Sequence, residues 1–175
     1  MDLSVIVITR NEEANIAECL ASVGFAGEIV VVDSASTDST AHIAQQAGAK
    51  VVSTTDWPGF GAQKNRALDL ATKTWVLSID ADERVTPQLQ DEIVAAIEAA
   101  PSNFNAWDMP RRSSFCGRFM SHSGWYPDRV TRLFRRESAR FSDDLVHEHV
   151  VVKGPVGHLR SDLLHATYPD LETML

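Results

Sequence analysis

Residues 74–83 read TWVLSIDADE, a run of mostly apolar side chains that gives way to three acidic ones within four positions. The first part, Thr74–Ile79, has the length and composition of a strand buried on both faces of a sheet. Asp80 and Asp82 fall on the turn after it, where two carboxylates one residue apart can coordinate a hard divalent cation. Because Glu83 adds a third negative charge, we favour a metal site over an ordinary solvated turn.

The same order of strand and helix occurs three times before this segment. We predict the earlier strands at Leu3–Thr9, Glu28–Val32 and Lys50–Ser53. Asn11 is expected to cap the first helix, Gly48 to end the second, and Thr86 with Pro87 to begin the fourth. Four such units predict an α/β fold, a mostly parallel, doubly wound sheet with helices on both faces. Ligands of these sheets bind beyond the carboxyl ends of the strands.

Beyond residue 101 the pattern changes to strand-like pieces rich in aromatic residues and arginine, including Val130–Arg135 and Leu145–Val152. The chain of 175 residues, 44% hydrophobic and 23% charged, has the size and composition of a single globular domain. Cys19 and Cys116 form no CxxC pair, which excludes a disulfide scaffold and a cysteine-based zinc site. With no apolar run near the ~20 residues of a membrane helix and no signal-peptide pattern, we expect a cytoplasmic protein.

Charge is distributed unevenly along the chain, whose formal net charge is −8. Residues 111–140 hold eight arginines against Asp128 and Glu137. Arginine suits phosphate and carboxylate groups, so this stretch predicts an anionic partner, with a solvated face as the alternative. The overall acidity and the lack of a known binding module exclude nucleic acid.

Two common nucleotide-binding motifs are absent. Where a Rossmann protein carries G-x-G-x-x-G after its first strand, this chain has Thr9-Arg10-Asn11-Glu12, and no P-loop occurs. A dinucleotide-binding dehydrogenase and a P-loop NTPase are therefore excluded. Asp33, which ends the second strand, is a second candidate ligand-binding residue, with a helix cap as the alternative.

Several of these segments, in this order, resemble family 2 glycosyltransferases, the inverting enzymes of the GT-A fold. The matching segments are VIVITRNEE, EIVVVDSASTDST, GFGAQKNRALDLATKTWVLSIDADE, WYPDRVTRLFRR and LVHEHV. Within that family the chain is most similar to lipopolysaccharide core glycosyltransferases, which add a sugar, often glucose, to the inner core. The resemblance implies one catalytic domain over residues 1–175, with a nucleotide-sugar-binding half at 1–100 and an acceptor-binding half at 101–175.

The resemblance also implies roles for individual residues. The expected nucleotide-binding residues are Thr9, Asn11, Glu12, Asp33, Lys64 and Asp80. Asp82 is the expected ligand of Mg²⁺ or Mn²⁺, and a UDP-sugar is the expected donor. An inverting transfer needs a general base, and Glu148 of the Val146-His147-Glu148 motif is the candidate, with Asp143 and Asp144 as rivals. The three histidines His147, His149 and His165 are expected to be structural, with a metal-ligand role as a weaker alternative.

The acceptor is expected to be an anionic glycan such as the lipopolysaccharide inner core. Trp125 offers an aromatic face for a sugar ring beside Arg129 and Arg132, although core packing is an equal alternative for Trp125. Family members often have a second acid after Asp33, where this chain has Ser34, so the base contact rests on Asp33 alone. Relatives usually continue beyond HATYPDLETML, so we expect a missing C-terminal part and peripheral association with the inner membrane.

Three other functions share some of these features. A phosphatase of the haloacid dehalogenase type also uses D-x-D after a strand, but Arg84 stands where its motif has Thr or Val. A phosphorylation-controlled receiver domain would carry its acceptor aspartate after the third strand, where Ser53 and Thr54 stand. A non-catalytic nucleotide-sugar-binding domain is the third alternative.

Overall fold

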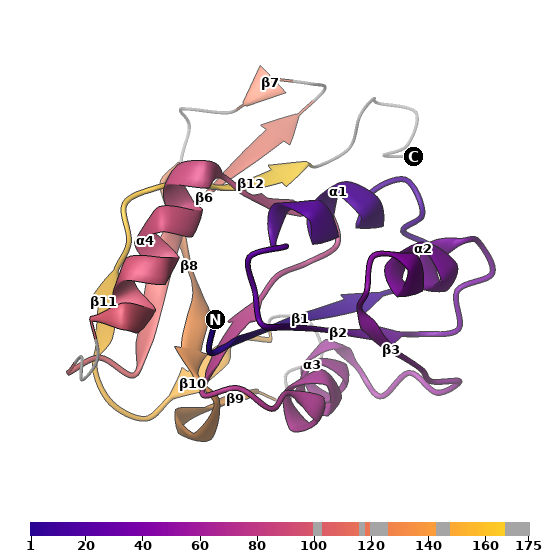
Figure 1. Ribbon diagram of the computed structural model, residues 1–175, viewed down its shortest axis with the longest axis horizontal. Coiled ribbons are helices and arrows are strands. Elements are labelled where there is room, and N and C mark those ends of the chain that lie inside the picture. Colours follow the sequence, from indigo (N-terminus) through magenta and orange to yellow (C-terminus); the bar gives the residue numbers. More distant parts are fainter. Residues whose placement is uncertain (100–102, 116–117, 120–125, 143–147, 167–175) are drawn as a thin grey trace.

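The computed structural model describes residues 1–99, 103–115, 118–119, 126–142 and 148–166 (Figure 1). The helices are α1 (Ile16–Ser22), α2 (Thr40–Gln46), α3 (Phe60–Leu70) and α4 (Pro87–Glu98), with a 3-10 turn, η1 (Arg136–Ser138). The strands are β1 (Leu3–Thr9), β2 (Glu28–Asp33), β3 (Lys50–Ser53), β4 (Trp75–Ser78), β5 (Glu83–Val85), β6 (Ala106–Phe115), β7 (Arg118–Phe119), β8 (Asp128–Arg135), β9 (Ala139–Phe141), β10 (Val150–Val152), β11 (Val156–His158) and β12 (Leu163–Ala166). None of the described helices combines the length and apolar character that a membrane span requires.

A mixed sheet runs through the described residues in the order β3-β2-β1-β4-β8-β6-β12-β5. Its first four strands are parallel, which confirms the prediction for the N-terminal half. β8 then pairs antiparallel with β4, and β6 antiparallel with β8. Thr9 lies opposite Asp33, and the Ile79 amide donates to the carbonyl of Ile6. The carboxyl ends of β1, β2 and β4 therefore meet at one edge of the sheet.

Two apolar clusters hold helices against opposite faces of this sheet (Figure 1). Because side chains alternate along a strand, Val5 and Val7 of β1 pack in the cluster with α1 and α4, while Ile6 packs in the cluster with α3. Each of these side chains is almost fully buried, and such burial stabilises the fold by roughly 1.5–3 kcal/mol per residue. The two faces explain why the strands of this half are apolar throughout.

The first helix begins later than predicted. Asn11 has a φ of 54°, in the left-handed region, and its side-chain oxygen accepts a hydrogen bond from the Thr37 amide at 2.8 Å. The amides of Asn15 and Ile16 donate to the carbonyl of Glu12, and α1 starts at Ile16. The expectation that Asn11 caps this helix is wrong, because its side chain ties the β1–α1 loop to the β2–α2 loop instead.

The other helix boundaries follow the prediction. The hydroxyl of Thr86 accepts from the Leu89 amide at 3.2 Å, and Pro87 opens α4. Gly48, just after α2, has a φ of 85°, a left-handed conformation that glycine adopts without strain. The cap of α4 and the end of α2 are thus confirmed.

The second half of the chain completes the sheet. The strand predicted at Val130–Arg135 is present and starts earlier, at Asp128, whereas only Val150–Val152 of the predicted Leu145–Val152 strand is described as β10. Residues 145–147 lie outside the described part of the chain. The short strand β5 was not predicted, and it pairs antiparallel with β12, His165 opposite Glu83. This pairing brings the C-terminal strand to the turn that carries Asp80 and Asp82.

Candidate active site

A cleft of about 660 Å³ opens beyond the carboxyl ends of β1 and β4. Its volume falls within the range of small-molecule binding sites. Eight of its twelve lining residues are polar or charged, and Trp57 and Phe60 form an aromatic pair among them. The lining residues are Ile8, Thr9, Arg10, Glu12, Trp57, Phe60, Lys64, Asp80, Ala81, Asp82, Glu148 and His165. Of the predicted site residues, the cleft brings together Thr9, Glu12, Lys64, Asp80, Asp82 and Glu148.

Asp80 accepts from a different cation on each of its oxygens. Lys64 Nζ lies 3.0 Å from Oδ1, and Arg132 Nη2 lies 2.8 Å from Oδ2. Burial disfavours the charged carboxylate, but Arg132 and Lys64 outweigh this and hold the pKa of Asp80 well below its usual range. Asp80 is therefore ionised at neutral pH and is held by two cations at the edge of the cleft.

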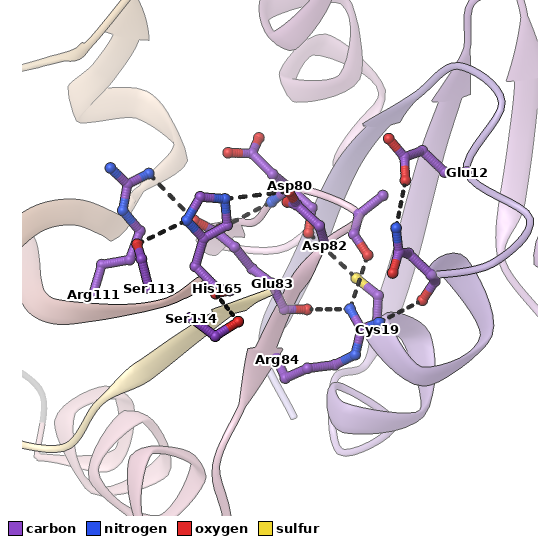
Figure 2. Close-up of polar contacts among 12 residues, drawn as sticks. Glu12, Cys19, Asp80, Asp82, Glu83, Arg84, Arg111, Ser113, Ser114 and His165 are labelled. Carbon is purple, nitrogen blue, oxygen red and sulfur yellow. Dashed lines mark hydrogen bonds and ion pairs between the residues drawn. The ribbon is translucent and has the colours of Figure 1, made fainter. Parts of the chain in front are cut away.

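Glu83 lies beneath Asp80 and is fully buried. Its Oε2 accepts from the Asp80 amide at 2.9 Å, and its Oε1 accepts from Arg132 Nη2 at 2.7 Å. Burial raises the pKa of Glu83, and Arg132 offsets only part of that rise. The side chain of Arg84 donates to the carbonyls of Ala81 and Glu83 (Figure 2). These hydrogen bonds hold the Asp80–Asp82 turn in one conformation.

Asp82 points toward His165, which comes from β12 (Figure 2). The His165 Nε2 atom lies 3.2 Å from Asp82 Oδ2, and its Nδ1 lies 3.0 Å from the Ser113 hydroxyl. Asp82 keeps 32% of its side chain exposed, facing the cleft. A carboxylate suits Mg²⁺ and Mn²⁺, and an imidazole suits divalent transition metals. Within the described residues there is no cluster of three or more His, Cys, Asp or Glu that could hold a metal ion.

Glu148 lies on the other side of Lys64. Its Oε1 is 2.9 Å from Lys64 Nζ, so one ammonium group bridges Glu148 and Asp80. A Cβ added at Gly61 would lie 1.9 Å from the Ser142 carbonyl oxygen and 3.7 Å from Glu148 Cβ. The first turn of α3 is thus pressed against the backbone that precedes Glu148. The rival candidates Asp143 and Asp144 lie outside the described residues.

The remaining predicted nucleotide-binding residues differ in accessibility. Thr9 lines the cleft and donates to Asp33 Oδ1 at 3.0 Å. Asp33 is almost fully buried, and its Oδ2 accepts from the Ser36 amide at 3.0 Å, as in a turn cap. Glu12 lines the cleft, and its pKa is raised by burial and by the nearby Asp82. Asn11 is exposed and directed toward the β2–α2 loop, outside the set of cleft-lining residues.

The arginines of residues 111–140 are mostly paired with carboxylates. The pairs are Arg111 with Asp128, Arg112 with Asp162, Arg129 with Asp108, Arg132 with Asp80 and Glu83, Arg136 with Glu137, and Arg140 with Asp69. Several of these carboxylates come from distant parts of the chain, so the local excess of positive charge is balanced in three dimensions. The argument from charge for an anionic partner is weakened accordingly.

The predicted acceptor-binding residues do not share one environment. Arg132 is buried beneath the cleft against Asp80 and Glu83. Arg129 is more exposed and donates to Asp108 and to the carbonyl of Leu159. Both line a second pocket of about 440 Å³ that shares Lys64, Asp80 and Glu148 with the main cleft. Trp125 lies outside the described residues.

The cleft also contains residues that were not among the predicted site residues. His165 was expected to be structural, with a metal-ligand role as the weaker alternative, and its contact with Asp82 depends on the unpredicted β5–β12 pairing. Trp57 and Phe60 line the cleft from the β3–α3 segment. The only signal in the sequence was two large aromatic residues within the segment DWPGFG, where loops are usually polar.

Comparison with known proteins decides the family. The model of Glycosyl transferase family 2 matches residues 4–155, most of the chain and all of the strands that form the cleft edge. The chain belongs to glycosyltransferase family 2. The resemblance inferred from the sequence is thereby confirmed, and the haloacid dehalogenase and receiver alternatives are not favoured.

One similar relative is the lipopolysaccharide core biosynthesis glycosyltransferase LpsC of Rhizobium meliloti. The two sequences are 36% identical over 171 residues, which cover 94% of this chain and 63% of LpsC. The chain therefore spans less than two thirds of that relative's length.

Two solved structures place this family 2 chain in the GT-A fold. Staphylococcus aureus TarS in complex with UDP-GlcNAc superimposes with a TM-score of 0.70 at 20% identity, covering 96% of this chain and 59% of TarS. Glucosyl-3-phosphoglycerate synthase of Mycobacterium tuberculosis, in complex with Mn²⁺, UDP-glucose and phosphoglyceric acid, gives a TM-score of 0.53 at 26% identity. That match covers 62% of this chain and 43% of the synthase. The predicted α/β, GT-A fold class is confirmed.

Proposed function

We propose that this chain is the catalytic domain of an inverting, metal-dependent glycosyltransferase. It would move a hexose from a UDP-sugar to a glycan acceptor of the lipopolysaccharide core. The observation that carries the proposal is the cleft itself, which places Asp80, Asp82, Lys64 and Glu148 around one space at the carboxyl ends of β1 and β4. The family, the UDP-sugars bound by two solved neighbours and the likeness to LpsC support the substrate class.

The donor half of the cleft is assigned to the N-terminal strands. Thr9 and the buried Asp33 would contact base and ribose, with Glu12 beside them and Asn11 holding the loop. Lys64 would contact the diphosphate, because it lines the cleft and its ammonium group lies between Asp80 and Glu148. The carboxylate of Asp80 would lie near the ribose of the bound donor. This division follows the strand order, in which β2 and β1 precede β4 across the sheet.

Asp82 and His165 are the residues that would hold Mg²⁺ or Mn²⁺, with diphosphate oxygens completing the coordination. They fit because a partly exposed carboxylate and a ring nitrogen line the same cleft, and Ser113 fixes the orientation of the imidazole. The metal would neutralise the charge that develops on the departing diphosphate.

Glu148 is assigned as the general base. It would take the proton of the acceptor hydroxyl as that oxygen attacks the anomeric carbon from the side opposite the departing UDP, so that the configuration inverts. In the structure Glu148 is paired with Lys64 at 2.9 Å. If diphosphate attracts the Lys64 ammonium group, Glu148 is released for proton transfer only when a donor is present.

The acceptor is assigned to the second pocket, beside Glu148. Arg129 lines it, and Trp125 is retained as a proposed contact from outside the described residues. Arg132 is also a wall of this pocket, but its two carboxylate partners give it a second role, the positioning of Asp80. Association with the cytoplasmic face of the inner membrane and the metal-dependent, inverting reaction all belong to this proposal.

A donor screen tests the proposed function. Thermal shift is measured with UDP-glucose, UDP-galactose, GDP-mannose and ADP-heptose, each with and without Mn²⁺. A UDP-sugar that stabilises the protein only with the metal supports the proposal, since a ligand that binds only the native state raises its stability. Stabilisation by none of the donors contradicts it.

A further inference from the structure

Two large aromatic side chains are exposed in the cleft. Trp57 is 45% exposed and Phe60 is 46% exposed, and their rings meet edge to face with centroids 4.9 Å apart. Both line the same space as Thr9, Lys64 and Asp80. Exposed aromatic surface is costly in water, so its concentration in a cleft indicates a binding surface.

The segment that carries this pair is anchored on both sides. Arg66 of α3 forms two hydrogen bonds with Asp56, at 2.9 and 2.6 Å, and the side chain of Gln63 donates to Thr54 at 2.7 Å. Trp57 comes directly after Asp56 in the sequence, and Phe60 is the first residue of α3. The aromatic surface is therefore preformed, which lowers the entropy cost of binding a ring against it.

The position of the pair indicates which part of a ligand it contacts. The amide of Thr54 donates to the carbonyl of Asp33 at 2.8 Å, so the segment leaves the sheet beside the buried end of β2. At its other end, Phe60 and Lys64 are four residues apart on one face of α3. The pair thus lies between the strand ends assigned to base and ribose and the lysine assigned to diphosphate.

We infer that Trp57 and Phe60 form the stacking wall for the nucleobase of the donor. This assignment rests on the proposed function and adds residues from the β3–α3 segment to it. A base between this wall and the backbone of β1 would cover the exposed faces of the rings. Stacking on an aromatic face tolerates any base, so Trp57 and Phe60 would supply affinity, while polar groups near Thr9 would select the base.

Calorimetric titration of UDP, in the presence of Mn²⁺, tests the inference on the wild-type protein and on Trp57→Ala. We expect the affinity for UDP to fall by roughly 5- to 100-fold, the range of single base–aromatic stacks. Trp57→Phe should retain most of the affinity, because a ring face remains. The affinity for inorganic pyrophosphate should be unchanged, because it has no base.

Phe119→Ala is the matched control, since Phe119 is equally exposed, at 46%, but does not line the cleft. An unchanged UDP affinity in Trp57→Ala, while the wild-type protein binds UDP, overturns the stacking assignment alone. An equal loss of pyrophosphate affinity also overturns it, because the effect would then lie at the diphosphate. Failure of the wild-type protein to bind UDP contradicts the proposed function and this inference together.

Discussion

At the scale of single residues, the candidate site depends on the ion pairs that Asp80 and Glu83 form with Arg132 and Lys64. Arg132 contacts both carboxylates from below, and Lys64 reaches Asp80 from the side of the cleft. Removing one member of such a buried network leaves an uncompensated charge, which typically costs about 3–5 kcal/mol. Arg132 therefore combines a structural role with any contact it makes to the acceptor.

Glu148→Gln tests the assignment of the base. Glutamine keeps the size of the side chain and can still accept from Lys64, but it cannot take a proton from the acceptor. We expect kcat to fall by about 10²–10⁴-fold with UDP affinity retained, as measured by steady-state kinetics and calorimetry. Asp143→Asn and Asp144→Asn are the comparisons. A collapse of kcat in either of them, with normal turnover in Glu148→Gln, would move the base upstream.

Acid titration tests the ion pairs of Asp80. The folded protein holds the pKa of Asp80 below its ordinary value of 3.8, so the pairs stabilise the native state above that pH. Their contribution is lost progressively as the pH falls below the ordinary value toward the lowered one, because the unfolded chain binds a proton at this carboxyl group in that range and the native protein does not. In urea titrations from about pH 5 to about pH 3, the stability difference between wild type and Asp80→Asn should shrink. A difference that grows on acidification contradicts this account.

At the scale of elements, α3 carries more of the site than any other helix. Its first turn supplies Phe60, its second supplies Lys64, and Gly61 allows it to lie against the backbone at Ser142. β8 pairs antiparallel with β4 and so brings Arg132 to the turn after β4. The geometry between the candidate base and Asp80 therefore depends on the packing of α3 against the backbone at Ser142.

Gly61→Ala tests this packing. An added Cβ would lie 1.9 Å from the Ser142 carbonyl oxygen, so α3 and the backbone at Ser142 must separate. We expect a loss of roughly 1–3 kcal/mol of stability, together with a lower kcat, because Glu148 would shift relative to Lys64. Gly24→Ala is the control, since its Cβ would meet the Ala21 carbonyl oxygen at an ordinary 3.6 Å. Equal stability and activity in the two variants would show that the contact does not matter.

The helices and strands also show which parts of the fold could be predicted from the sequence. The parallel strands were predictable because each is a continuous apolar run, and Thr86-Pro87 marks the start of α4 by its own chemistry. β5 was not predictable, because three residues carry no periodicity, and its partner β12 lies about 80 positions away. The prediction that Asn11 caps the first helix is wrong because a tertiary contact with Thr37 overrides the preference of asparagine for a helix cap.

At the scale of the whole molecule, the carboxylates of the site were predictable and their partners were not. Asp80, Asp82 and Glu148 follow from motifs that the chain shares with its family. The contacts of Arg132 with Glu83, of Lys64 with Glu148 and of His165 with Asp82 join residues that are far apart in the sequence. Most arginines of residues 111–140 likewise pair with carboxylates that the fold brings close to them, which the sequence alone does not show.

The central claim is that Asp82 makes nucleotide binding depend on a metal. Calorimetric titration of UDP into the wild-type protein and Asp82→Asn, with and without Mn²⁺, tests it most directly, with Asp69→Asn as the surface control. We predict that Mn²⁺ tightens UDP binding by more than about tenfold in the wild type and in Asp69→Asn. In Asp82→Asn the UDP affinity should be the same with and without Mn²⁺, and the melting temperature should equal that of the wild type. UDP affinity that is the same with and without Mn²⁺ in the wild type, or metal dependence that survives in Asp82→Asn, would contradict the claim.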